Sequence, residues 1–300
     1  MTRMPPAEPA RESGEADGSE TKFLLLGAFC VVHRKKELPL GPRKQKVLLA
    51  HFLLNPNRPL SVSSLLEVLW DDPPPSAVKN VQLYVGRIRR ALGEIDSVCR
   101  LHTVSRGYQL DIDSERVDAE VFRRLVRDAS RARRAHRLDQ AAVLFGEALE
   151  LWRGKPLELL AGTVALDTEI GMLEDMRLMA CEEYFGLMLE TGRHRAAIPE
   201  LRRMVAAYPQ QEHLRYQLML ALSRSGDRSA ALSTYRSGYR LLVEDLGIEP
   251  SRTLRDLHDA ILADTAPTRT PPHPAAPLRA TSPVRNARPG SRRSALQRAL

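Results

Sequence analysis

A repeat in the second half of the chain constrains its fold more than any other sequence feature. The segments "GRHRAAIPELRRMVAAYP" and "GDRSAALSTYRSGYRLLVED" align with Gly192 over Gly226 and Ala197 over Ala231, an offset of 34 residues. An earlier segment, "LDQAAVLFGEALELW", begins in the same way. This offset is the period of tetratricopeptide helical pairs, in which small residues let the paired helices approach closely. We therefore expect a stack of helical pairs.

The whole region from Asp118 onward has helical periodicity. Apolar residues recur every three to four positions in segments separated by Gly, Pro or Asp, namely 118–136, 139–152, 167–191, 193–207, 212–225, 227–244 and 251–263. Pro199 interrupts one of these patterns, so we expect that helix either to begin later or to kink there. Residues 118–264 are thus predicted to form an all-α, tetratricopeptide-like helical-repeat domain.

The first part of the chain has a different pattern. The apolar run "KFLLLGAFCVVH", broken by Gly27, predicts strands, and "ELPLG" predicts a short edge strand limited by Pro39. Helical spacing then predicts three helices, in "RKQKVLLAHFLLN", "SVSSLLEVLW" with a serine cap, and "SAVKNVQLYVGRIRRALG". The segment "RLHTVSRGYQLDI" predicts a hairpin that turns at residues 105–107. Residues 22–113 are therefore expected to form an α+β domain.

The two ends of the chain lack the apolar residues that a core requires. Residues 1–21 and 265–300 are rich in small, charged and proline residues, so we expect both to be disordered. No apolar run approaches the roughly 20 residues of a membrane span, and the N-terminus has no apolar signal region. The three cysteines are far apart, which argues against disulfides. We expect a cytoplasmic protein without a membrane partner.

Charge is unevenly distributed along the chain. Residues 22–110 carry 14 Lys and Arg against 6 Asp and Glu, whereas residues 111–265 carry 22 against 26. The chain therefore joins a basic region to a mildly acidic one. Such asymmetry favours a polyanionic partner for the basic region.

The third predicted helix has an apolar side and a cationic side. At 100° per residue, Val81, Val85, Ile88 and Leu92 form one seam. The other side carries polar, basic and exposed apolar residues: Lys79, Asn80, Leu83, Arg87 and Arg90, with Gln82, Tyr84 and Arg89 as flanks. The major groove of B-DNA admits one helix and displays acceptors that such side chains read, while Gly86 would permit close approach. A plain solvated helix face is the alternative interpretation.

Two further groups of basic residues could contact a duplex. Arg106 lies at the predicted hairpin turn, where a wing would reach the minor groove or phosphates. Arg43, Lys44 and Lys46 lie at the start of the first predicted helix, where side chains and backbone amides could meet phosphate.

These elements together resemble a known family. The strands, the three helices and the hairpin motif of Thr103, Val104, Arg106, Gly107 and Tyr108 are similar to the winged-helix DNA-binding domain of OmpR and PhoB response regulators. The segments "LELWRGKPL", "LMLALSRSGDRSAAL" and "LLVEDLGIEPSRTLRDLH" resemble the bacterial transcriptional activation domain. In this order, over about residues 22–264, the chain resembles the Streptomyces antibiotic regulatory proteins of the AfsR, DnrI and RedD type. It departs from that family's pattern in its short wing, Gly86 and Pro199.

The resemblance implies a transcriptional activator that binds direct repeats of double-stranded DNA near promoters. It would act as a homodimer on DNA and recruit RNA polymerase holoenzyme at an antibiotic gene cluster. No catalytic motif such as Gly-x-Ser-x-Gly occurs, so we expect neither enzymatic activity nor a cofactor. The third helix would be the recognition helix, and Trp70, Asp71 and Asp72 would face the polymerase. For this loop, a rigid turn with a buried tryptophan is the alternative. Only 21 residues precede the first strand, and no GxxxxGK[ST] motif occurs, so neither phosphorylation of a receiver domain nor ATP is expected.

Two other classes of function remain open. The helical repeats could form an interaction scaffold while the basic region only localises the protein, or the chain could be a ligand-gated repressor with an effector in the helical region. The histidines and cysteines show no metal-ligand spacing. Neighbouring acids such as Glu182 and Glu183 lie among cations, which predicts solvated faces and not a catalytic pair.

Overall fold

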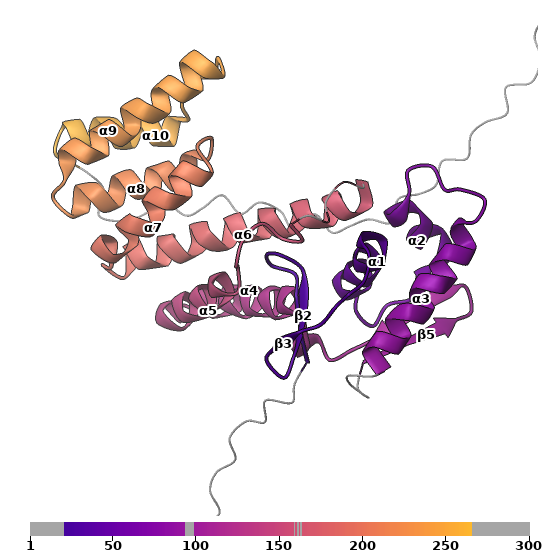
Figure 1. Cartoon of the computed structure of the whole chain (residues 1–300). Coiled ribbons are helices and arrows are strands. Elements are labelled where there is room, and N and C mark those ends of the chain that lie inside the picture. The colour runs from indigo at the N-terminus through magenta and orange to yellow at the C-terminus, as the bar shows by residue number, and fades with distance from the viewer. Residues whose placement is uncertain (1–20, 94–98, 159, 161, 163, 266–300) are drawn as a thin grey trace, which may run out of the picture. The chain divides into compact units, whose positions relative to one another are not determined.

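The computed structural model describes residues 21–93, 99–158, 160, 162 and 164–265 (Figure 1). The disorder expected for the two ends concerns residues that lie almost entirely outside this range. Within it the chain is mostly helical, with short strands near its N-terminus, and the predicted fold class is confirmed. No helix among the described residues has the length and apolar character to cross a bilayer.

Two small antiparallel sheets accompany the first three helices. The first has the order β1-β2-β3, formed by Thr21–Leu24, Cys30–His33 and Lys36–Glu37. The second has the order β4-β6-β5, formed by Leu60–Ser61, Gly107–Asp111 and Arg100–Val104. The predicted hairpin is confirmed as β5 and β6. The edge strand β3 ends before Pro39, earlier than predicted, and the two-residue strand β4 was not predicted because it is too short to show a period.

The first three helices end and begin close to their predicted limits. They are α1 (Arg43–Leu54), α2 (Val62–Leu69) and α3 (Ala77–Gly93). The predicted serine cap is present, since the Ser61 hydroxyl accepts a hydrogen bond of 3.1 Å from the Ser64 amide. The predicted seam of α3 is buried, with at most 4% of any of its four side chains exposed. This seam fixes which side of α3 faces solvent.

The wing depends on a close approach between two strands. Tyr108 on β6 pairs with Leu60 on β4, and a Cβ atom added to Gly107 would lie 1.8 Å from the Leu60 carbonyl oxygen. Because the obstructing atoms belong to the backbone, only glycine fits at this position. The Val62 amide also donates to the Arg106 carbonyl at 3.3 Å. The hairpin is therefore held from one side by the segment that starts α2.

Helices form the rest of the described chain, as predicted. After a 3₁₀ turn at Ser114–Arg116 come α4 (Asp118–Arg134), α5 (Leu138–Glu150), α6 (Val164–Glu190), α7 (His194–Ala207), α8 (Glu212–Arg224), α9 (Arg228–Tyr239), a π turn (Arg240–Asp245) and α10 (Arg252–Leu262). The pairs α4 with α5, α6 with α7 and α8 with α9 pack together (Figure 1).

The repeat seen in the sequence corresponds to three equivalent turns inside these pairs. His136, Gly192 and Gly226 have φ of 56°, 77° and 88°. At each turn the next amide donates to a carbonyl five residues earlier: Arg137 to Ala132 at 2.9 Å, Arg193 to Met188 at 2.8 Å and Asp227 to Leu222 at 2.9 Å. This is the Schellman arrangement that ends a helix with a left-handed residue. The aligned Ala197 and Ala231 are both buried.

Pro199 lies inside a helix. The alternative in which the helix begins later is wrong, because α7 begins at His194. Proline removes the amide that would bond to the carbonyl of Arg195, and both residues are exposed. Water can therefore satisfy that carbonyl, which explains why the proline is tolerated.

A buried carboxylate joins the first sheet to the helical region. Asp118, the first residue of α4, accepts hydrogen bonds from the amides of Leu25 at 2.7 Å and Leu26 at 3.1 Å, and it lies 3.3 Å from the guanidinium of Arg153. Burial raises the pKa of Asp118, and the two amide donors oppose this rise. The Arg153 amide in turn donates to the Leu26 carbonyl at 2.8 Å. A single hydrophobic core extends from β1 to α6, containing for example Phe23, Phe52, Phe122 and Phe145.

Candidate nucleic-acid interface

The cationic side of α3 is accessible to solvent. Lys79, Arg87 and Arg90 are exposed and lie opposite the buried seam, as the helical spacing predicted. Gln82 is exposed as well, and Leu83 leaves 48% of its side chain in contact with water. An apolar side chain this exposed gains nothing for the fold. Lys79, Arg87 and Arg90 therefore form a cationic ridge beside the exposed Leu83 side chain. No other part of the chain that the structure describes covers this ridge.

Two other predicted contact residues on α3 are partly engaged. Asn80 is half-buried, and its amide donates a hydrogen bond of 3.3 Å to the Ser76 hydroxyl one turn earlier. Tyr84 is half-buried and packs against the core. Both lie at the edges of the exposed ridge, and their side chains are restrained by the fold.

Arg89 holds the hairpin against α3. Its Nε donates to the Leu101 carbonyl at 2.6 Å, and its Nη2 donates to the Thr103 hydroxyl at 2.8 Å. The guanidinium also lies 5.7 Å from the centre of the Tyr108 ring on β6. Arg89 was predicted to flank the DNA-contacting side, but these bonds direct it toward both strands of the wing. Its role in this structure is to position the wing relative to α3, a role that periodicity along one helix does not reveal.

The wing presents Arg106 at its tip. The turn between β5 and β6 consists of Ser105 and Arg106, and both are exposed. Gly107 beside them is buried under β4. Arg106 and the ridge of α3 are therefore carried by two elements that Arg89 joins directly.

Two of the three basic residues at the start of α1 have partners within the protein. Arg43 donates from Nη2 to the Leu160 carbonyl at 3.1 Å. The Lys44 ammonium lies 4.1 Å from the centre of the Trp70 ring, and burial together with the charge of Arg43 lowers the pKa of Lys44. Lys46 is half-buried. The sequence predicted that all three side chains could contact phosphate. It did not predict the contacts of Arg43 with Leu160 or of Lys44 with Trp70, because these residues are distant along the chain.

The loop after α2 separates into a packed tryptophan and two exposed acids. The Trp70 amide donates to the Leu66 carbonyl at 2.9 Å, and its half-buried ring packs against the core and the Lys44 ammonium. Asp71 and Asp72 are exposed. The Trp70 ring is thus packed but only half-buried, so the alternative of a buried tryptophan is met in part, and the two carboxylates are accessible to a partner.

The described residues contain no group of three or more His, Cys, Asp or Glu side chains able to hold a metal ion. Cys99 and Cys181 are buried thiols and Cys30 is half-buried. Burial raises the pKa of Cys181 to about 12, which keeps this thiol neutral.

Comparison with known families places two successive domains on the chain. The family described as "Transcriptional regulatory protein, C terminal" matches residues 35–110. The family described as "Bacterial transcriptional activator domain" matches residues 117–262. The first match contains α1 to α3 and the hairpin, and the second contains the helical pairs.

Individual relatives match most of the length of this chain. Regulatory protein DnrI of Streptomyces peucetius is 34% identical over 248 residues, which cover 79% of this chain and 90% of that protein. Regulatory protein AfsR of Streptomyces griseus is 34% identical over 262 residues, covering 87% of this chain but only 26% of AfsR. A solved structure of Mycobacterium tuberculosis EmbR, in complex with a low-affinity phosphopeptide, has a TM-score of 0.75 at 31% identity and covers 82% of this chain and 66% of that one.

Proposed function

Because this chain belongs to the Streptomyces antibiotic regulatory protein family, we propose that it is a sequence-specific DNA-binding activator of a specialised-metabolite gene cluster. It is a transcriptional regulator with an OmpR-type DNA-binding region and a bacterial transcriptional activator domain. In this proposal it binds direct repeats near promoters as a homodimer and recruits RNA polymerase, within the cytoplasm.

The observation that carries the proposal is the exposed ridge on α3. Any amphipathic surface helix buries one side, so two other features distinguish α3. The wing is tied to its flank by Arg89, and the apolar Leu83 is exposed beside Lys79, Arg87 and Arg90. Rigid presentation lowers the entropy lost when side chains are immobilised against base edges. We propose that Arg87 and Arg90 with Gln82 and Leu83 read bases in the major groove.

The remaining predicted contacts take supporting roles in the proposal. Arg106 at the tip of the wing reaches the adjacent minor groove or its phosphates. Lys46 and Lys79 contribute phosphate contacts, and Lys44 contributes through its position beside Trp70. Asn80 and Tyr84 act at the edges of the ridge. Arg43 contributes electrostatic potential while its guanidinium remains bonded to Leu160.

A titration of labelled duplexes tests DNA recognition. Fluorescence anisotropy with duplexes from the promoters next to the gene would show binding tighter than to random duplex at moderate salt. Arg87→Ala should cost about 1–3 kcal/mol and relax the choice of base at one position. Lys46→Ala should weaken binding to all sequences similarly and flatten the salt dependence. Arg202→Ala, a change at an exposed arginine of α7, should leave both unchanged.

Equal affinity for promoter and random duplex would refute sequence-specific recognition. Cooperativity between repeats is measured separately, with duplexes that carry one or two copies one helical turn apart. Tighter binding per copy on the paired duplex supports a dimer on DNA, and additive binding contradicts it.

Recruitment of polymerase is tested by transcription in vitro. The double variant Asp71→Asn, Asp72→Asn should retain promoter affinity and lose activation, because the proposal assigns the exposed carboxylates to the polymerase. Asp175→Asn on the exposed side of α6 is the matched control and should activate normally. Full activation by the double variant would remove these two residues from the polymerase contact. Transcript levels of the neighbouring genes, with and without the regulator, test the assignment to a biosynthetic cluster.

A further inference from the structure

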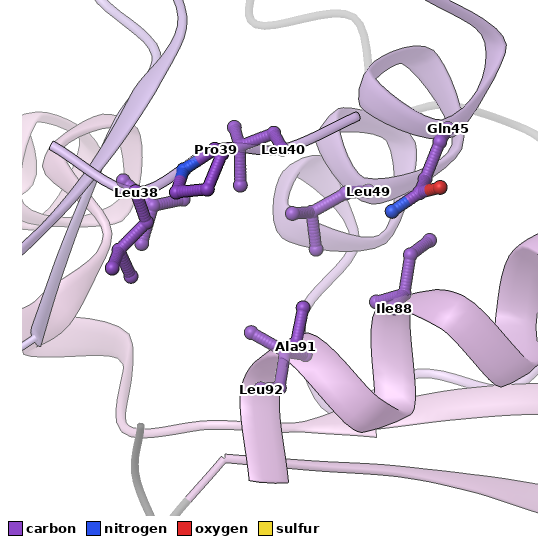
Figure 2. A pocket seen from close by; sticks show the side chains of 9 residues that line it. Leu38, Pro39, Leu40, Gln45, Leu49, Ile88, Ala91 and Leu92 are labelled. Atoms are coloured by element: carbon purple, nitrogen blue, oxygen red, sulfur yellow. The ribbon is translucent and has the colours of Figure 1, made fainter. Parts of the chain in front are cut away.

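A small cavity lies behind α3, on the side away from the cationic ridge. Its volume is about 110 Å³. The residues that line it come from β2, the segment after β3, α1 and α3: Val31, Leu38, Pro39, Leu40, Gln45, Leu49, Ile88, Ala91 and Leu92. Figure 2 shows Leu38, Pro39 and Leu40 on one side and the α1 and α3 side chains on the other. Exposed Pro39 and half-buried Ala91 lie where the cavity meets the surface.

The lining is apolar except for one amide. No charged side chain is among the lining residues. Gln45 is only 7% exposed, and its side chain points from α1 toward Ile88 (Figure 2). Within the described part of the chain, the Gln45 side-chain amide has no hydrogen bond to another protein group, and its atoms are not among the fully buried atoms that lack a partner. The side-chain amide is therefore accessible to solvent, and an occupant with one polar group can bond to it in place of water.

The size and lining of the cavity select the class of occupant. An apolar cavity of about 150 Å³ stays dry and binds benzene, and a stable buried water needs about two to four polar partners. This cavity offers one polar side chain and less volume. We propose that it binds a small neutral molecule of about six heavy atoms, apolar except for one hydroxyl or carbonyl group that bonds to Gln45.

The site is part of the support of α3. Ile88, Ala91 and Leu92 lie on the inner side of the same helix whose outer side carries Arg87 and Arg90. A bound molecule therefore contacts the helix directly. Binding at this site does not depend on the proposed function, and its test contains no DNA.

The experiment uses phenol and benzene as probes of the full-length protein, followed by methyl NMR. Phenol should cause saturable shifts confined to methyl groups around the cavity, such as those of Leu49, Ile88 and Leu92. The variant Gln45→Leu should weaken phenol binding about fivefold to tenfold and leave benzene binding within about twofold, since only phenol bonds to the amide. Gln140→Leu, at an exposed glutamine of α5, is the matched control and should change neither affinity.

A second variant keeps the proposal testable if Gln45→Leu does not fold. Ala91→Leu fills the cavity from α3 and should abolish binding of both probes while the remainder of the spectrum is retained. Wild-type spectra without saturable shifts at the cavity methyl groups would overturn the site. Equal weakening of phenol and benzene by Gln45→Leu would overturn the assignment of the amide as the ligand's hydrogen-bond partner.

Discussion

Replacing Gly86 by alanine should make the protein more stable and its binding to DNA weaker. Gly86 lies in the middle of α3, and a Cβ atom added to it would meet no heavy atom within 4 Å. Alanine in an exposed helix interior is favoured over glycine by about 1 kcal/mol. For a chain of this size, that change raises the midpoint of thermal unfolding by about 2–4 °C.

The effect on DNA binding should have the opposite sign. Gly86 lies on the exposed side of α3 beside Arg87, where the proposed recognition brings the backbone close to the duplex. A methyl group there holds α3 away from the groove and lengthens its hydrogen bonds to bases. We expect the dissociation constant to rise about fivefold to tenfold for alanine, equivalent to about 1–1.4 kcal/mol, and further for Gly86→Leu.

Two assays on the same preparations separate these effects. Thermal unfolding measures the first, and anisotropy with a promoter duplex measures the second. Gly171→Ala is the matched control, because Gly171 is also within a helix, α6, and its added Cβ meets no atom within 4 Å. The control should gain stability without losing affinity. Unchanged or tighter DNA binding by Gly86→Ala would refute the close approach of α3.

Three further predictions follow from contacts in the structure. Gly107→Ala should lower the free energy of unfolding by about 3 kcal/mol in urea titrations, because the new Cβ meets the Leu60 carbonyl oxygen, and an unchanged midpoint would contradict the strand packing. The prediction that Glu182 lies on a solvated face is wrong, because its side chain is buried. Burial raises the pKa of Glu182 from 4.5 to about 7, so its stabilising contribution is present below pH 4.5 and lost as the pH rises through 7. Glu182→Gln should therefore stabilise the protein by about 3 kcal/mol at pH 8 and change little at pH 4, as urea titrations at both values would show. Arg89→Gln should weaken DNA binding because the wing is no longer held against α3. Its effect on the dissociation constant should therefore be smaller when Arg106→Ala is already present. Additive effects of the two substitutions on the binding free energy would exclude this coupling.

Periodicity in the sequence was sufficient to predict which elements form. The seam of α3 follows from apolar residues at helical spacing, and its burial follows because four such side chains on one side must leave water. Ser61 predicted the start of α2 through a bond that spans only three residues. The aligned segments at Gly192 and Gly226 predicted the helical pairs, and each glycine ends a helix in the left-handed conformation, which is a local requirement. Each of these signals lies within one element or one turn.

Contacts between distant segments were not predictable in this way. Helical spacing predicts Arg89 as one of the cations that flank the exposed side of α3. Its hydrogen-bond acceptors lie in the hairpin, more than ten residues later in the chain, so the spacing within α3 could not indicate them. Lys44 and Trp70 come from different elements, and neither position carries a periodic signal for the other. The sequence predicts Asp118 only as the start of the helical region. The backbone amides that donate hydrogen bonds to its carboxylate lie in the turn after β1.

The spacing of apolar, capping and turn residues along the sequence thus determined the helices, the hairpin, the order of domains and the cationic side of α3. The tertiary structure alone decided which of the cations remain free, because hydrogen bonds and ring contacts between residues far apart in sequence form only once the core brings them together. The same packing forms the cavity beside Gln45. The shape of this cavity depends on how side chains from four separate segments pack around it, which no single segment of the sequence indicates.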